Sequence, residues 1–246
     1  FDTGVHSFGT APIAQVERSP EFSESVQQAV DVDSVGGSGV AIIDAYHVSG
    51  SVGDVCVGST AVFVFKEKEI KVGVRRVNQV YSDGLLPDVN APPFDENKRR
   101  DLEKYLNETY RCANLSFKVF VFDDLSIDYD VSRDGKLSPA EDEVIDRKAW
   151  GQDMNYMVYL VHWIGLPDFT APGGGYFNPN DDRNSVFVAG VYVDERTVAH
   201  ELGHAMGLEH PFDSGDYDPE NLMNYTSPFD LLRGPQWVII NPVDGK

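Results

Sequence analysis

The chain has 246 residues, 41% of them hydrophobic, which is enough to bury a core in one large domain, alone or with a smaller one. Its formal net charge of −20 disfavours binding to nucleic acid and to anionic membrane surfaces, which need basic residues. No apolar run approaches the ~20 residues of a membrane span, and no signal peptide is visible at Phe1. The simplest explanation of the excess of acidic residues is that they lie on solvent-exposed surfaces. Calcium binding and secretion into saline surroundings are the alternatives.

Residues 1–68 are predicted to form a β-rich domain or segment of unknown role. Two apolar, β-branched runs, 39–50 and 54–65, are separated by glycine and serine, as is typical of a hairpin. A short helix with a serine cap is expected before them at 19–30. No catalytic motif is found in this segment.

From residue 69 the pattern changes to strands and helices, and residues 69–246 are predicted to form a second domain. Leu102, Tyr105, Leu106 and Tyr110 have helical spacing and indicate an amphipathic helix of about 16 residues. A last helix is expected to carry the histidine-rich stretch described next. Strands are expected at 69–83, 115–124, 153–164 and 184–193. These elements predict an α+β fold in which a sheet backs the histidine helix.

The stretch TVAHELGHAMGLEHPFD, residues 197–213, contains three of the chain's six histidines. His200 and His204 are four residues apart, so both imidazoles can reach one metal ion from the same face of a helix. Glu201 is close enough to touch a metal-bound water without binding the metal. Zinc with three protein ligands keeps a position for water and lowers its pKa to about 7, so that a carboxylate can take its proton. The spacing is a known metalloprotease signature.

The residues after this helix extend the pattern. Gly207 can adopt a positive φ at little cost, end the helix and turn the chain back. His210 can then supply a third nitrogen, and Pro211 stops any helical continuation. A helix that merely contains histidines would explain the first pair, but not the glycine and the third histidine as well. His162, inside the apolar run 153–164, has no second ligand nearby and is expected to be an ordinary core histidine.

The run from His200 to His210 resembles the long zinc-binding consensus of the metzincin metallopeptidases. That family has a methionine-containing turn under the metal, and Met223 in NLMNY matches it as an apolar base that does not bind the ion. Tyr225 lies two residues further on, where astacins and serralysins have a tyrosine near the zinc. By resemblance, Tyr225 donates its hydroxyl to the oxyanion of the attacked carbonyl; a packed aromatic is the alternative.

The resemblance implies a twisted, mostly parallel sheet backed by the active-site helix and a second helix, with an upper part at 69–210 and a lower part at 211–246. It implies a zinc endopeptidase in which the three histidines bind the metal and Glu201 is the general base. Protein or peptide substrates would lie along the edge strand of the sheet. The enzyme is expected to be a secreted monomer.

A second metal site is predicted at residues 130–141, DVSRDGKLSPAE, which match a twelve-residue calcium loop. Gly135 stands at the sharp turn, and the apolar Leu137 at position eight resembles an EF-hand loop. The preceding flank is strand-like, unlike an EF-hand, and a lone acidic turn is the alternative. Calcium here would have a structural role. The expected ligands are Asp130, Ser132, Asp134, the carbonyl of Lys136, Ser138 and Glu141.

Two cysteines leave three arrangements open. A disulfide between Cys56 and Cys112 is expected first, then two buried free thiols, then capping of the zinc by Cys56 as in matrix metalloproteinase propeptides. Two other functions compete with the peptidase: a calcium-stabilised binding or adhesion module with a non-catalytic zinc site, and a latent proenzyme inhibited by residues 1–68. Glu201 argues against the first, because a structural site closed by four ligands needs no base.

Overall fold

The chain falls into two compact units, residues 1–67 with 241–246, and residues 68–240. No helix among the described residues is long and apolar enough to cross a bilayer. The computed structural model describes residues 2–7, 14–17, 31–34, 39–49, 53–134, 137–138, 141–150, 153–166, 169–171, 174–177, 184–189, 194–211, 220–224 and 231–242.

The described part of the first unit consists mainly of strands. The expected hairpin is present, and its register shifts between Ala45 and Tyr46. The helix expected at 19–30 lies outside the described residues. The strands form two antiparallel sheets, in the orders β1-β4-β5 and β2-β3: β1 (Asp2–Ser7), β2 (Ala14–Glu17), β3 (Asp31–Ser34), β4 (Gly39–Ser49) and β5 (Gly53–Val64).

The second unit is built on a five-stranded sheet in the order β11-β12-β8-β6-β7. Four of its strands are parallel, and β11 pairs antiparallel with β12 at one edge. The α+β class predicted from the sequence is therefore confirmed. In chain order the elements are β6 (Lys68–Gln79), α1 (Glu96–Thr109), β7 (Leu115–Ile127), α2 (Asp142–Ala149), β8 (Tyr156–Val161), β9 (Ile164–Leu166), β10 (Phe169–Ala171), β11 (Gly174–Phe177), β12 (Ser185–Ala189), α3 (Glu195–Ala205) and α4 (Gly234–Ile240), with a 3-10 turn at Arg111–Ala113.

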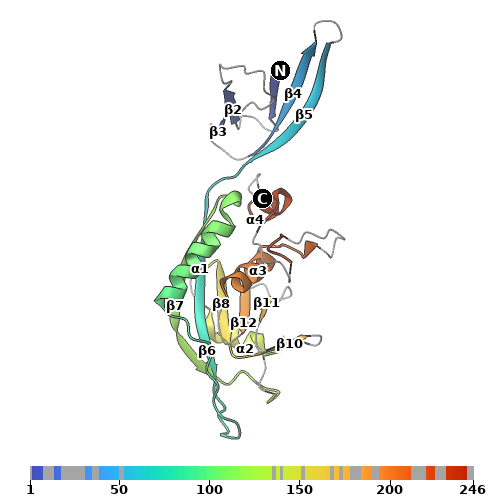
Figure 1. The fold of residues 1–246 in the computed structure, drawn as a ribbon. Helices are drawn as coiled ribbons and strands as arrows, with labels where there is room; N and C mark the ends of the chain where they lie inside the picture. The colour runs from blue at the N-terminus through green and yellow to red at the C-terminus, as the bar shows by residue number, and fades with distance from the viewer. Residues whose placement is uncertain are drawn as a thin grey trace. The chain divides into compact units, whose positions relative to one another are not determined.

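Helices cover both faces of this sheet, with α1 and α3 on one face and α2 on the other (Figure 1). Alternate residues of β8 point to opposite faces. Val158 and Leu160 join the core under α1 and α3, whereas Met157 and Tyr159 join the core that contains Ile145 of α2. Burial on both faces explains why this strand is apolar throughout.

One prediction about this strand was wrong. The apolar run had suggested a strand to residue 164 with His162 in the core. Instead β8 ends at Val161, and His162 is exposed directly after it.

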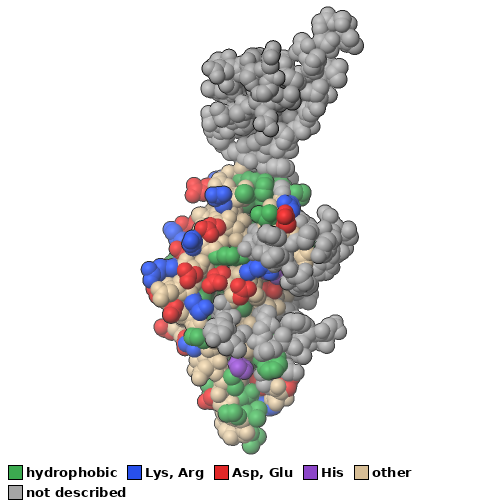
Figure 2. Space-filling model, viewed as in Figure 1, with side chains coloured by type: hydrophobic (Ala, Val, Ile, Leu, Met, Phe, Trp, Pro, Cys, Tyr) green, Lys and Arg blue, Asp and Glu red, His purple; other side chains and the backbone are tan. Residues whose placement is uncertain are grey.

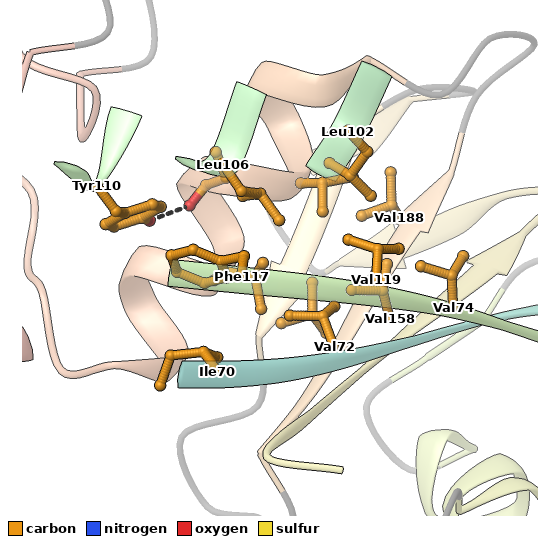
Figure 3. Packing of buried hydrophobic residues seen from close by; sticks show 14 of the residues in the cluster. Ile70, Val72, Val74, Leu102, Leu106, Tyr110, Phe117, Val119, Val158 and Val188 are labelled. Carbon is orange, nitrogen blue, oxygen red and sulfur yellow. Dashed lines mark hydrogen bonds between the residues drawn. The ribbon is translucent and has the colours of Figure 1, made fainter. Parts of the chain in front are cut away.

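Helix α1 is placed by its cap and by two leucines. The Asp95 carboxylate accepts hydrogen bonds from the backbone N–H groups of the first turn, which have no partner inside the helix. Leu102 and Leu106 are buried against the valines of β6, β7 and β8 (Figure 3). Burial of such a side chain contributes about 1.5–3 kcal/mol. At the end of the helix, the Tyr110 hydroxyl donates to the Ala199 carbonyl of α3 at 2.6 Å, which ties the two helices together.

Polar side chains of α1 also cover the backbone of the edge strand β7. The Asn107 amide accepts from the Phe117 N–H at 2.8 Å and donates to the Phe117 carbonyl at 3.0 Å. The Glu103 carboxylate accepts from the Val119 N–H at 2.8 Å. The helix therefore satisfies edge groups that would otherwise be open to another strand.

Figure 2 shows one face of the described residues. Acidic and basic side chains are interspersed on this face, so the excess negative charge does not form one continuous acidic patch there. Arg99 pairs with Glu96 and Glu103, each at 2.8 Å, and Lys118 pairs with Glu69 at 2.6 Å. Ion pairs at the surface, such as Lys118–Glu69, add little stability. They do break up the negative charge along α1 and the neighbouring edge of the sheet.

Candidate metal centre

Helix α3 begins at a capped end and stops at a glycine turn. The Asp194 carboxylate accepts from the Arg196 N–H at the start. At the end, Gly207 has a φ of +94°. Its N–H bonds to the His204 carbonyl and the Leu208 N–H bonds to the Gly203 carbonyl, both at 2.9 Å. This pair of bonds is the Schellman arrangement, so the predicted role of Gly207 as the end of the helix is confirmed.

The glycine turn brings the three motif histidines together. The Nε2 atoms of His200 and His204 are 3.2 Å apart, those of His204 and His210 are 3.0 Å apart, and those of His210 and His200 are 3.3 Å apart. Tetrahedral ligands at about 2.0–2.1 Å from a zinc ion lie ~3.3 Å from one another. This triangle of imidazole nitrogens therefore has the size of one face of a tetrahedral zinc site, and the group can hold a metal ion.

Backbone carbonyls orient two of the rings. His200 Nδ1 lies 2.9 Å from the Leu222 carbonyl oxygen, and His204 Nδ1 lies 2.8 Å from the Leu208 carbonyl oxygen. A carbonyl oxygen only accepts, so each Nδ1 carries the proton and each Nε2 presents its lone pair to the centre of the triangle. Converging lone pairs repel one another unless a cation lies between them, and this favours metal binding.

The charge state of the innermost histidine fits the same role. Burial lowers the pKa of His200 to about 4, and the neighbouring His204 adds to this, although the bond to the Leu222 carbonyl opposes it. The ring is therefore neutral near pH 7, which is the form that binds metals.

A turn at Asn221–Asn224 packs against α3. Two side chains of α3, His200 and Arg196, hydrogen-bond to the backbone of this turn. The Leu222 carbonyl accepts from His200 Nδ1 and from Arg196 Nη2, the latter at 3.1 Å. Arg196 Nη2 also donates to the Asn224 carbonyl at 2.8 Å. The contact that orients the His200 ring is thus itself fixed by Arg196, a residue that sequence reasoning did not single out.

Met223, at the centre of this turn, is fully buried and packs directly on α3. A Cβ built on Gly203 would lie 2.6 Å from the Met223 sulfur. Gly203 lies between the first two histidines of the motif in sequence, so the methionine supports the helix at the motif itself. Its role as the family's Met-turn residue stays a prediction.

The second support of the turn comes from α4, which was not predicted. The side-chain amides of Asn221 and Gln236 pair with each other at 2.9 and 3.2 Å, and Gln236 also accepts from the Arg233 N–H at 2.8 Å. The dipeptide Gly234–Pro235 was the available signal, because proline is favoured in the first turn of a helix.

Glu201 follows His200 in the sequence and is buried, and burial raises the pKa of its carboxyl to about 8. A cation held by the three imidazoles opposes this shift, since it favours the carboxylate. The side chain lies against Gly175 of the edge strand β11, where a Cβ would be 2.1 Å from Glu201 Cγ. Sequence reasoning missed Gly175; the run of three glycines at 173–175 was the available signal.

Hydrogen bonds occupy the two buried carboxylates of the predicted calcium loop. Asp130 accepts from Tyr81 Oη at 2.6 Å and from the Asp134 N–H at 3.1 Å. Glu141 accepts from the Ser132 N–H at 2.8 Å and from the Ser138 hydroxyl at 2.7 Å.

Asp130 and Glu141 are buried, as is Leu137, whereas Asp134 is exposed; Gly135 and Lys136 lie outside the described residues. In the part of the chain that the structure describes, these carboxylates do not form a cluster close enough to hold an ion, whereas the three histidines do. Calcium therefore remains a prediction.

Two further predictions concern Tyr225 and the cysteines. Tyr225 lies outside the described residues, so its predicted bond to the oxyanion stays a prediction. Cys112 is an exposed thiol, and nothing is described of the Cys56 side chain, so the expected disulfide between them stays a prediction.

No family model and no curated protein matches this chain. Among solved structures, it is similar to the archaemetzincin of Methanopyrus kandleri, with 15% identity and a TM-score of 0.45, over 70% of this chain and 93% of that one. It is also similar to a chain in a chaperone–substrate complex, with 12% identity and a TM-score of 0.39, over 89% of this chain and 37% of that one. Likenesses of this size assign neither a family nor an activity.

Proposed function

We propose that this protein is a zinc-dependent endopeptidase of metzincin type, which hydrolyses peptide bonds in proteins. One observation carries the proposal: three imidazole Nε2 atoms converge within 3.0–3.3 Å of one another. Glu201, which follows His200 in the sequence, is buried. Three neutral nitrogen ligands leave one tetrahedral position open, as in catalytic zinc sites, whereas a structural site is closed by a fourth protein ligand.

The residues of the site have distinct roles in this proposal. His200, His204 and His210 hold the zinc, which supplies Lewis-acid activation of water and of the scissile carbonyl when it is bound. Glu201 takes a proton from the attacking water and passes it to the leaving amine. Tyr225 donates its hydroxyl to the oxyanion that forms on the carbonyl.

The substrate is proposed to lie in an extended conformation along β11. This strand ends the sheet on the side where Glu201 contacts Gly175. A peptide there would extend the sheet by main-chain hydrogen bonds and bring its carbonyl to the metal.

The test compares casein and peptide-library hydrolysis by the full chain and by Glu201→Gln at equal zinc content. Glutamine keeps the shape of the side chain but cannot take the proton, so we expect a loss of about 10²–10⁴ in kcat. Glu209→Gln is the matched control, because Glu209 is exposed just beyond the same helix. Equal rates for the wild type and Glu201→Gln, or no hydrolysis by either, would favour the binding-module alternative.

A structural calcium ion at residues 130–141 is a separate part of the proposal. Buried Asp130 and Glu141 supply carboxylates from the two ends of the loop. We expect millimolar calcium to raise the melting temperature of the wild type and to have a smaller effect on Glu141→Gln. Glu143→Gln, at an exposed position of α2, is the control. The same melting temperature with calcium and with a chelator would remove calcium from the proposal.

The proenzyme alternative assigns an inhibitory role to residues 1–68. It predicts that residues 69–246 alone are more active than the full chain. The expectation of a secreted monomer is tested by the oligomeric state in solution and by the compartment in which the natural protein is found.

A further inference from the structure

Gly175 occupies a position in β11 where a side chain has no room. A Cβ added there would lie 2.1 Å from Glu201 Cγ, 2.6 Å from Cδ and 2.6 Å from Oε1. These three nearest atoms all belong to Glu201. The φ of Gly175 does not fall in the left-handed region, so space and not backbone conformation calls for glycine.

The surroundings decide which group would yield to an added methyl group. Gly175 is held in the sheet opposite Val188 of β12. Glu201 belongs to a helix that is buried on this side and tied to α1 through the Tyr110–Ala199 hydrogen bond. Two backbones are therefore fixed, and the flexible part is the Glu201 side chain.

We infer that Gly175 is a positioning residue, whose lack of a side chain lets the Glu201 side chain keep its place against β11. The inference rests on the proposed function and deepens it. The substitution Gly175→Ala therefore displaces the Glu201 side chain. The cost falls on catalysis, because the group that moves is the general base.

The expected result for Gly175→Ala follows from this geometry. Removing a contact of 2.1 Å moves the carboxyl by about an ångström, and a displacement of that size costs on the order of 100-fold in kcat. Zinc affinity, measured by competition with a chelating dye, and KM should both stay within about threefold of the wild type. Gly84→Ala is the control. Gly84 has a φ of +67°, so this variant should be less stable, but no atom lies within 4 Å of the added Cβ, so its kcat should not change.

A double-mutant cycle separates positioning from a general disturbance. In the Glu201→Ala background the obstructing side chain is gone, so Gly175→Ala should lower the residual kcat by less than about threefold. An equal loss in both backgrounds would overturn the inference. So would a wild-type kcat for Gly175→Ala, or an effect confined to KM, which would assign Gly175 to substrate binding.

A crystal structure of Gly175→Ala gives a readout that needs no activity. We expect the Glu201 side chain in another rotamer and the three imidazoles in place. An unmoved Glu201 with a shifted β11 would overturn the inference. If the wild type hydrolyses no peptide, the proposed function fails, and this structure still decides whether Gly175 sets the position of Glu201.

Discussion

Replacing Gly203 by alanine tests how tightly the turn at 221–224 packs on the histidine helix. The new Cβ would lie 2.6 Å from the Met223 sulfur, 3.3 Å from its Cε and 3.4 Å from Tyr110 Oη. Met223 is fully buried, and Tyr110 is held by its 2.6 Å bond to the Ala199 carbonyl. Neither neighbour can withdraw without disturbing the core.

Two opposing terms set the size of the effect. Alanine is better than glycine in a helix interior by about 1 kcal/mol, which favours the variant. Overpacking of a filled core costs about 1–3 kcal/mol, which disfavours it. We expect the second term to win, so that the free energy of unfolding of Gly203→Ala falls by about 1 kcal/mol and its melting temperature by about 2–4 °C.

The assay is denaturant unfolding of the zinc-free protein for Gly203→Ala, Met223→Ala and the double variant. Met223→Ala alone should cost about 2–5 kcal/mol because it leaves a cavity. In that background the methyl group added by Gly203→Ala enters the vacated space, so the effect of this substitution should change sign to stabilising. Stabilisation of the wild type by Gly203→Ala, or the same effect in both backgrounds, would refute the reasoning.

Three other outcomes are expected. Arg196→Met loses the bonds that hold the Leu222 and Asn224 carbonyls, so zinc affinity should fall about 10- to 100-fold in a chelator competition, whereas exposed Arg100→Met should not change it. Asn107→Ala leaves the Phe117 N–H and carbonyl without their partner and should lower the free energy of unfolding by about 1–3 kcal/mol in a urea titration. Zinc at 100 times its dissociation constant should stabilise the chelator-treated protein by about 2.7 kcal/mol in the same titration; no change would argue against a folded metal site.

The sequence was sufficient where one local pattern determines structure. The spacing of Leu102 and Leu106 predicted α1, and Gly207 predicted the end of α3, because both depend on contacts within a few residues. The convergence of the histidines followed from the same local geometry.

Elements that depend on distant contacts were missed. The sequence does not show that the Leu222 carbonyl orients His200, since 22 residues separate them. Strand β11 is only four residues long and contains two glycines, so it lacks the alternation by which strands are recognised. Glycine is required at position 175 because the Glu201 side chain, which comes from α3, occupies the space that a side chain there would need.

The contacts of Asn107 and Glu103 with β7 bear on how copies of the protein meet in solution. Joining two sheets side by side at β7 would require each copy to give up its Asn107 and Glu103 bonds before a new ladder could form. Polymerisation through the edge strand β7 therefore starts with the loss of the hydrogen bonds that Asn107 and Glu103 make to its backbone. Side chains of one helix protect the protein against fibre growth there, without any proline in the strand itself.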